Sequence, residues 1–280
     1  MNSDSRILRP EDYTEPQCPL CDVTRRSGPA GTPIPQQRVR EKLDDYMSRR
    51  DYAGAERHLL YWLEEARACG DQRGELMVLN ELVGHYRKTG DRDNSLAHGE
   101  AALQLLEDPD YSGTLTAATT YVNVATACNA FGDNQRSLEL FRQAQPIYEA
   151  TARTAPDLLG GLYNNMALTL VALGRFQEAH ALYDQAMAVM ALAPGGVLEQ
   201  AITCLNRADA LAAECGMEHA EGQIYDLVDQ AYALLLDPSA PRDGYYAFVC
   251  EKCVPSFSFY GYFAAAEELA AAAEEIYERS

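Results

Sequence analysis

Four glycines recur at one fixed interval, and this interval constrains the fold of the 280-residue chain more than any other feature. They are Gly90, Gly132, Gly174 and Gly216, and each follows the previous one by 42 residues. A helical segment of about fourteen residues precedes each glycine, and a second amphipathic segment follows it. Glycine suits such a junction because a tight turn between two helices often needs a left-handed backbone. The interval therefore predicts a row of helix pairs.

Two outer segments extend the same pattern in a looser form. Arg50 takes the place of the glycine in the first segment, and Gly261 takes it in the last. Atypical terminal units are expected, because they must cover the exposed ends of the core. We therefore predict an all-α repeat domain of about six helix pairs over residues 36–280. The predicted units are residues 36–71, 72–113, 114–155, 156–197, 198–240 and 241–280.

Large and small residues alternate around Gly174 in a regular pattern. Aromatic Tyr163 and small Ala167 precede this glycine, and the matching residues after it are Phe176, Ala179, Tyr183 and Ala186. This pattern resembles the tetratricopeptide repeat in its 42-residue form, as found in kinesin light chains. The resemblance implies a right-handed α-α superhelix, a solenoid that binds protein or peptide segments and is not an enzyme.

Two residues depart from the pattern. Asp209 takes the small-residue site of the fifth unit, which places a carboxylate near a helix contact. Pro255 falls inside the first helix of the sixth unit and is expected to kink or shorten it.

The first helices of the pairs carry asparagine at two neighbouring positions, ten and nine residues before each glycine. In successive repeats these positions are occupied by Asn80, by Asn123, by Asn164 with Asn165, and by Asn206 with Arg207. Asparagine is a poor residue for a helix interior, because its amide competes with the backbone for hydrogen bonds. A recurring asparagine at these positions therefore needs a reason.

Two interpretations of the asparagines remain open. In the first they form a polar ladder on the concave face and pair with the backbone of an extended peptide, because an amide offers both a donor and an acceptor. The resemblance to kinesin light chain repeats implies this role for Asn123, Asn164, Asn165 and Asn206. In the second the amides bridge neighbouring helices or contact water.

Arg87 and Lys88 lie on the next turn of the second unit. Their charge either anchors an acidic residue or a C-terminal carboxylate of a bound peptide, or complements the dipole at a helix C-terminus. The complete set of predicted peptide-binding residues is Asn80, Arg87, Lys88, Asn123, Asn164, Asn165, Asn206 and Arg207.

Two cysteine pairs have the spacing of half a zinc site. They are Cys18 with Cys21 and Cys250 with Cys253. The second pair falls on packing positions of the last repeat, so only Cys18 and Cys21 are weak metal candidates. The remaining cysteines are interpreted as reduced thiols, because nothing in the sequence resembles a secretory signal.

Composition narrows the function classes. The net charge of −19 disfavours binding to nucleic acid or to a membrane surface. The sequence lacks a long apolar run, a phosphate-binding glycine loop and a hydrolase or metalloprotease motif. We therefore expect a cytoplasmic, non-catalytic adaptor or scaffold that needs no cofactor. The alternatives are a regulatory peptide sensor and a metal-dependent interaction module built on Cys18 and Cys21.

The two ends of the chain differ from its middle. Residues 1–35 are rich in proline and are interpreted as an extended or disordered arm. The last repeat is dense in aromatic residues, which either pack as a cap against the fifth repeat or form a surface for self-association or for a partner helix.

Overall fold

The structure is a computed structural model that describes residues 31–151 and 156–279. These residues form helices without β-strands, so the predicted all-α repeat fold is confirmed. The described chain divides into two compact units, one within Met1–Ser112 and one within Gly113–Ser280, here called unit 1 and unit 2. The division falls beside the predicted boundary between the second and third repeats.

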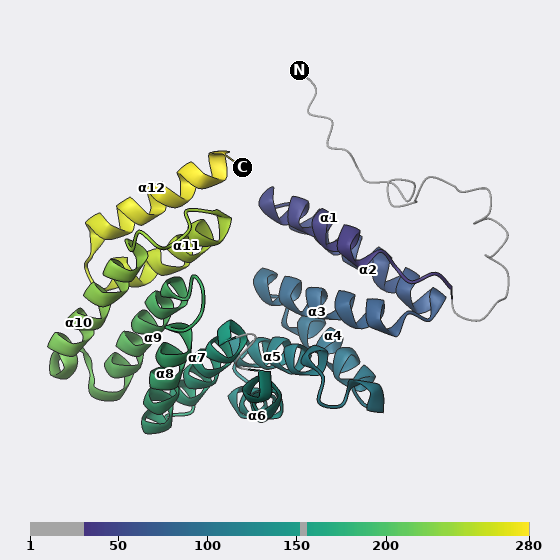
Figure 1. The fold of residues 1–280 in the computed structure, drawn as a ribbon, viewed down its shortest axis with the longest axis horizontal. Helices are drawn as coiled ribbons and strands as arrows, with labels where there is room; N and C mark the ends of the chain where they lie inside the picture. The colour runs from purple at the N-terminus through teal and green to yellow at the C-terminus, as the bar shows by residue number, and fades with distance from the viewer. Residues whose placement is uncertain (1–30, 152–155, 280) are drawn as a thin grey trace, which may run out of the picture. The chain divides into compact units, whose positions relative to one another are not determined.

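Unit 1 contains two helix pairs. Its helices are α1 (Gln36–Ser48), α2 (Tyr52–Cys69), α3 (Gln72–Thr89) and α4 (Arg92–Leu105), followed by the short 3₁₀ helix η2 (Pro109–Tyr111) (Figure 1). Aspartates at the starts of α2, α3 and α4 accept hydrogen bonds from backbone N–H groups of the first turn. Such caps satisfy donors that a helix start leaves unpaired.

Unit 2 contains four helix pairs. Its helices are α5 (Leu115–Ala130), α6 (Asn134–Thr151), α7 (Pro156–Ala172), α8 (Phe176–Met190), α9 (Val197–Cys215), α10 (Met217–Leu235), α11 (Gly244–Phe259) and α12 (Phe263–Arg279). Within this unit α5 contacts α7, α7 contacts α9, and α9 contacts α11. Figure 1 shows these first helices of the pairs along one side of the unit and the second helices along the other. The first helices therefore form one continuous wall.

The predicted turns adopt the left-handed backbone that the glycine interval implied. The φ angle is 81° at Gly90, 85° at Gly132 and 71° at Gly174. At the loosest predicted turn, Arg50 has a φ of 56° and is the one non-glycine residue with positive φ among the described positions. The backbone geometry of the turn is thus kept even where the glycine is missing, at a cost in strain.

The core of the fourth repeat follows the predicted alternation of large and small residues. In the fourth repeat Ala167, Ala179, Tyr183 and Ala186 are completely buried. Small side chains let the paired helices approach closely, while the tyrosine ring fills the space beside them. In the last two repeats one cluster joins α9, α10, α11 and α12, and it includes Tyr246 and Phe257. Part of the aromatic C-terminal segment is therefore core.

Both departures from the pattern have a structural outcome. Asp209 is exposed, and Ala208 takes the buried position instead. The turn after α9 consists of Gly216 alone, because α10 begins directly after it, whereas the turns at Gly90, Gly132 and Gly174 have two or three residues. Pro255 does not shorten α11, which continues to Phe259. The proline lies on the exposed side of α11, so packing of the buried side offsets the lost hydrogen bond.

Candidate functional site

The wall of first helices in unit 2 holds a direct contact between two of the predicted asparagines. Asn206 Nδ2 on α9 donates a hydrogen bond of 3.1 Å to Asn164 Oδ1 on α7. Asn164 is buried, with 6% of its surface exposed, and Asn206 is half-buried. The two residues are one repeat apart, so this bond ties equivalent positions of successive repeats together. For this pair the structure shows the bridging interpretation.

The pair retains hydrogen-bonding capacity. Among the described residues, Asn164 Nδ2 donates to no acceptor and Asn206 Oδ1 accepts from no donor. Neighbouring Asn165 is half-buried, and its backbone carbonyl accepts a 3.1 Å bond from Thr169 Oγ1. Its side-chain amide has no hydrogen-bond partner in the described chain. The wall thus presents both donors and acceptors beside one bridged pair.

The other predicted residues of unit 2 are placed differently. Asn123 is half-buried on α5, the first helix that precedes α7 in the wall. Arg207 is adjacent to Asn206, but its guanidinium pairs with Asp184 of α8 at 3.0 Å. This ion pair lies between a first and a second helix, so Arg207 does not add its charge to the amide pair. We call Asn123, Asn164, Asn165 and Asn206 the amide row.

Asn80, Arg87 and Lys88 belong to unit 1 and are therefore considered apart from the amide row. Asn80 Nδ2 donates to the carbonyl of Leu76 in its own helix at 2.8 Å. Arg87 is exposed at the end of α3. The Lys88 ammonium lies 5.5 Å from the centre of the Tyr52 ring, within the range of a cation–π contact. The structure thus gives Asn80 and Lys88 intramolecular partners.

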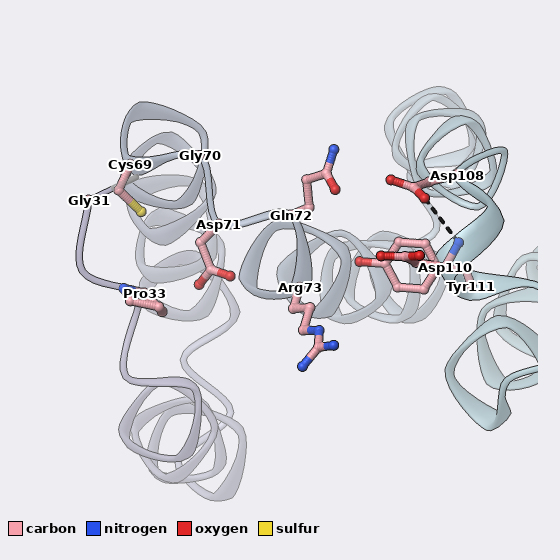
Figure 2. A pocket seen from close by; sticks show the side chains of 10 residues that line it. All are labelled: Gly31, Pro33, Cys69, Gly70, Asp71, Gln72, Arg73, Asp108, Asp110 and Tyr111. Atoms are coloured by element: carbon pink, nitrogen blue, oxygen red, sulfur yellow. Dashed lines mark hydrogen bonds between the residues drawn. The ribbon is translucent and has the colours of Figure 1, made fainter. Parts of the chain in front are cut away.

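A pocket of unit 1 lies at the start of α3 and has a volume of about 270 Å³ (Figure 2). Asp71 caps α3, and it also accepts a 3.0 Å bond from the backbone N–H of Ile34. Asp108 accepts a bond from the N–H of Asp110. Figure 2 shows Asp108, Asp110 and Tyr111 across the pocket from Asp71. The roles of Asp71 and Asp108 are therefore structural, in a helix cap and a turn.

The cysteine predictions divide into two parts. Cys18 and Cys21 lie outside the described residues. Cys250 and Cys253 are buried in α11, where burial raises the pKa of the first thiol to about 11 and of the second to about 12. Neutral buried thiols behave as small apolar residues. In the described ranges no group of three or more His, Cys, Asp or Glu side chains is placed to hold a metal ion.

Sequence reasoning missed the hydrogen bonds that tie α11 and the residue directly after it to α9. The Tyr260 hydroxyl donates to Asp209 at 2.6 Å, and the Tyr245 hydroxyl donates to Glu199. The dense tyrosines and acids of this segment were the available signal, but a tyrosine more than forty residues from its acid has no fixed spacing to reveal the pair. These bonds hold the last repeat against α9.

Comparisons with known proteins agree with the architecture. Residues 74–150 match the tetratricopeptide repeat family. Among solved structures, the nearly identical TPR-like repeats of a putative kinesin light chain from Podosopora anserina are 19% identical, with a TM-score of 0.50. That match covers 73% of this chain and 95% of the other. BtubC (BKLC) from P. vanneervenii is 18% identical, with a TM-score of 0.51 over 82% of this chain and 90% of the other.

No curated protein sequence matches the chain. The described residues also contain no helix long and apolar enough to cross a membrane. The predicted resemblance is confirmed by the family match and by the fold of the solved structures. Over residues 74–150 the chain resembles the tetratricopeptide repeat family, and the larger part of the chain shares the fold of the kinesin light chain type of repeat.

Proposed function

We propose that this chain is a non-catalytic scaffold that binds an extended peptide or protein segment along the first helices of unit 2. The observation that carries the proposal is the unpaired amide of Asn165 beside the Asn164–Asn206 bond. An asparagine inside a helix costs up to about 0.7 kcal/mol relative to alanine. The bond to Asn206 offsets this cost at Asn164, but no intramolecular bond of the Asn165 amide offsets it there.

The chemistry of the row suits a peptide backbone. Every peptide unit offers one N–H donor and one C=O acceptor, and a side-chain amide can pair with both. The Asn164–Asn206 bond also holds two of these amides in place, which reduces the entropy lost when a ligand binds. We therefore expect Asn165 and Asn206 to contact the peptide backbone, with Asn164 as their positioning residue.

The test starts from peptides selected on the wild-type protein from a random library. Each selected peptide is then titrated by isothermal calorimetry against wild type and Asn165→Ala. Loss of one or two hydrogen bonds should weaken binding by about fivefold to tenfold. Asn134→Ala is the matched control, because Asn134 lies on the second helix α6 and bonds to Asn129.

Two results would count against the proposal. One is a library that yields no saturable binder. The other is a set of binders whose affinities for wild type and Asn165→Ala are equal. Far-UV circular dichroism of each variant confirms that the helices are intact, so an affinity loss is not mistaken for unfolding.

A further inference from the structure

One face of α11 carries a continuous line of exposed side chains. These residues, here called the aromatic stripe, are Tyr245, Phe248, Lys252, Pro255 and Phe259. Their spacing alternates between three and four residues, which keeps them on one line along a helix. Tyr245 is 48% exposed, Phe248 is 47% exposed and Phe259 is 70% exposed.

The stripe is not part of the core of the last repeat. The opposite side of α11 supplies the core through Tyr246, Val249, Cys253 and Phe257, each at most 2% exposed. Tyr245 and Phe248 stack on each other, with ring centroids 6.3 Å apart. Three large aromatic residues in line on a single exposed helix face are typical of a surface that binds another helix.

The stripe lies on α11, the last helix of the wall, which packs against α9. The Tyr245 hydroxyl donates to Glu199, and Glu199 lies seven residues before Asn206 on α9. Seven residues are about two helical turns, so Glu199 and Asn206 share one face of α9. The stripe is thus a second surface next to the amide row, formed by apolar side chains instead of amides.

Charge identifies the kind of occupant. Residues 113–280 contain 21 Asp and Glu against 8 Lys and Arg. Glu251 is exposed on α11 beside the stripe, and Glu199 lies at its start. A second copy of the chain would bring like charges together, whereas a basic helix would meet opposite charges.

We propose that the aromatic stripe of α11 binds an amphipathic helix of a partner protein, with apolar residues at alternating spacings of three and four and with Lys or Arg beside them. The apolar residues of the partner pack on Tyr245, Phe248 and Phe259. Its cations face the surrounding carboxylates. Lys252 interrupts the apolar line and favours a partner that leaves room for the ammonium or places an acid opposite it.

The probe is a synthetic helix of about 18 residues, five turns, with leucine at the stripe spacing and lysine elsewhere. A second peptide carries glutamate in place of lysine. Fluorescence polarisation with the full chain should show saturable one-to-one binding of the lysine peptide and much weaker binding of the glutamate peptide. Phe248→Ser/Phe259→Ser should weaken binding of the lysine peptide by about tenfold or more.

Leu192→Ser is the matched control, because Leu192 is 80% exposed and lies outside the stripe. It should leave the affinity unchanged. Lys252→Glu tests charge without removing an aromatic ring, and it should strengthen binding of the lysine peptide by about threefold or more. Both substitutions are at exposed positions, so the fold is expected to persist in each variant.

Three results would overturn the inference. The first is equal binding of the lysine peptide by wild type and the double phenylalanine variant. The second is an affinity that falls with Asn165→Ala but not with the phenylalanine changes, which would place the peptide on the amide row. The third is self-association of the wild type, seen by sedimentation velocity and lost in the double variant, which would assign the stripe to a second copy.

This inference concerns a different surface from the amide row, so the two proposals fail separately. If the inference fails, the library peptides whose binding depends on Asn165 are unaffected. If the proposed function is refuted, the double phenylalanine variant should still bind the lysine peptide more weakly than wild type.

Discussion

Two glycines of the fourth repeat allow the role of glycine in a left-handed turn to be compared with its role inside a helix. Gly161 lies inside α7, and Gly174 lies in the turn that follows it. A Cβ atom added at either position would meet no heavy atom within 4 Å beyond the adjacent residues and the local backbone of its own helix. Steric crowding is therefore absent at both sites, and only the backbone conformation separates them. The φ angle of 71° at Gly174 lies in the region that disfavours an L side chain.

The two alanine substitutions should change stability in opposite directions. Gly161→Ala replaces glycine with the best helix former, and it should stabilise the protein by about 0.5–1 kcal/mol. Gly174→Ala forces alanine into the left-handed region, and it should destabilise the protein by about 1–2 kcal/mol. The variants should therefore differ by about 2 kcal/mol, which is a large share of the stability of a typical domain.

Gly160 supplies a third, intermediate case. It lies inside α7 like Gly161, but an added Cβ would be 2.5 Å from the Met190 Cε atom. Gly160→Ala gains stability from the higher helix propensity of alanine and loses stability because the flexible Met190 side chain must move. Its stability should therefore fall between those of Gly161→Ala and Gly174→Ala.

Urea unfolding followed by far-UV circular dichroism measures all three variants against wild type. Comparison of midpoints at similar slopes converts directly into stability differences. If Gly174→Ala proved as stable as Gly161→Ala, the turn would not require a left-handed residue. The physical account of the 42-residue interval would then be wrong.

Two further predictions concern buried polar groups. Tyr183 is completely buried, and its hydroxyl has no hydrogen-bond partner among the described residues. Tyr183→Phe should therefore stabilise the protein by about 1 kcal/mol. Tyr260→Phe removes the hydrogen bond to Asp209 and should destabilise the protein by about 1–2 kcal/mol. Urea midpoints that shift in the same direction for both would contradict this. Burial lowers the pKa of His58 below its ordinary value of about 6.5. Below about pH 6.5 the folded state therefore binds fewer protons than the unfolded state. The stability that neutral His58 contributes is complete above about pH 6.5 and declines as the pH falls below about 6.5. The stability difference between wild type and His58→Gln should therefore shrink from about pH 8 to about pH 5.5, and a constant difference would refute the assignment.

The fold could be predicted because the backbone conformation of the turns determines which residue occurs once in each repeat. A turn that needs a positive φ selects glycine, and the recurrence of Gly90, Gly132 and Gly174 exposes the length of the repeat. Arg50 shows why the outer units were harder to recognise: there the same backbone geometry is held by a residue without the signature. At Gly216 the turn is a single residue, shorter than the turns at Gly90, Gly132 and Gly174, yet the glycine interval is unchanged.

The candidate site could be predicted only in part. Periodicity indicates which helix face a residue occupies, and Asn164 and Asn206 do lie on adjacent first helices. It does not determine the partner of a side chain, which depends on rotamers and on the distance between helices. Arg207 illustrates the limit, because its pairing with Asp184 of α8 follows from packing between first and second helices. Spacing alone contains no signal for that contact.

The Asn164–Asn206 bond changes what a recurring asparagine means in this protein. An amide that meets the equivalent amide of the next repeat is accounted for by the structure, so its recurrence alone is not evidence of a ligand. Asn165 differs, because it shares the unfavourable helix position and has no intramolecular bond to its side-chain amide. Asn165, whose side-chain amide lies outside the intramolecular network, is therefore a stronger indicator of binding than the bridged pair Asn164–Asn206.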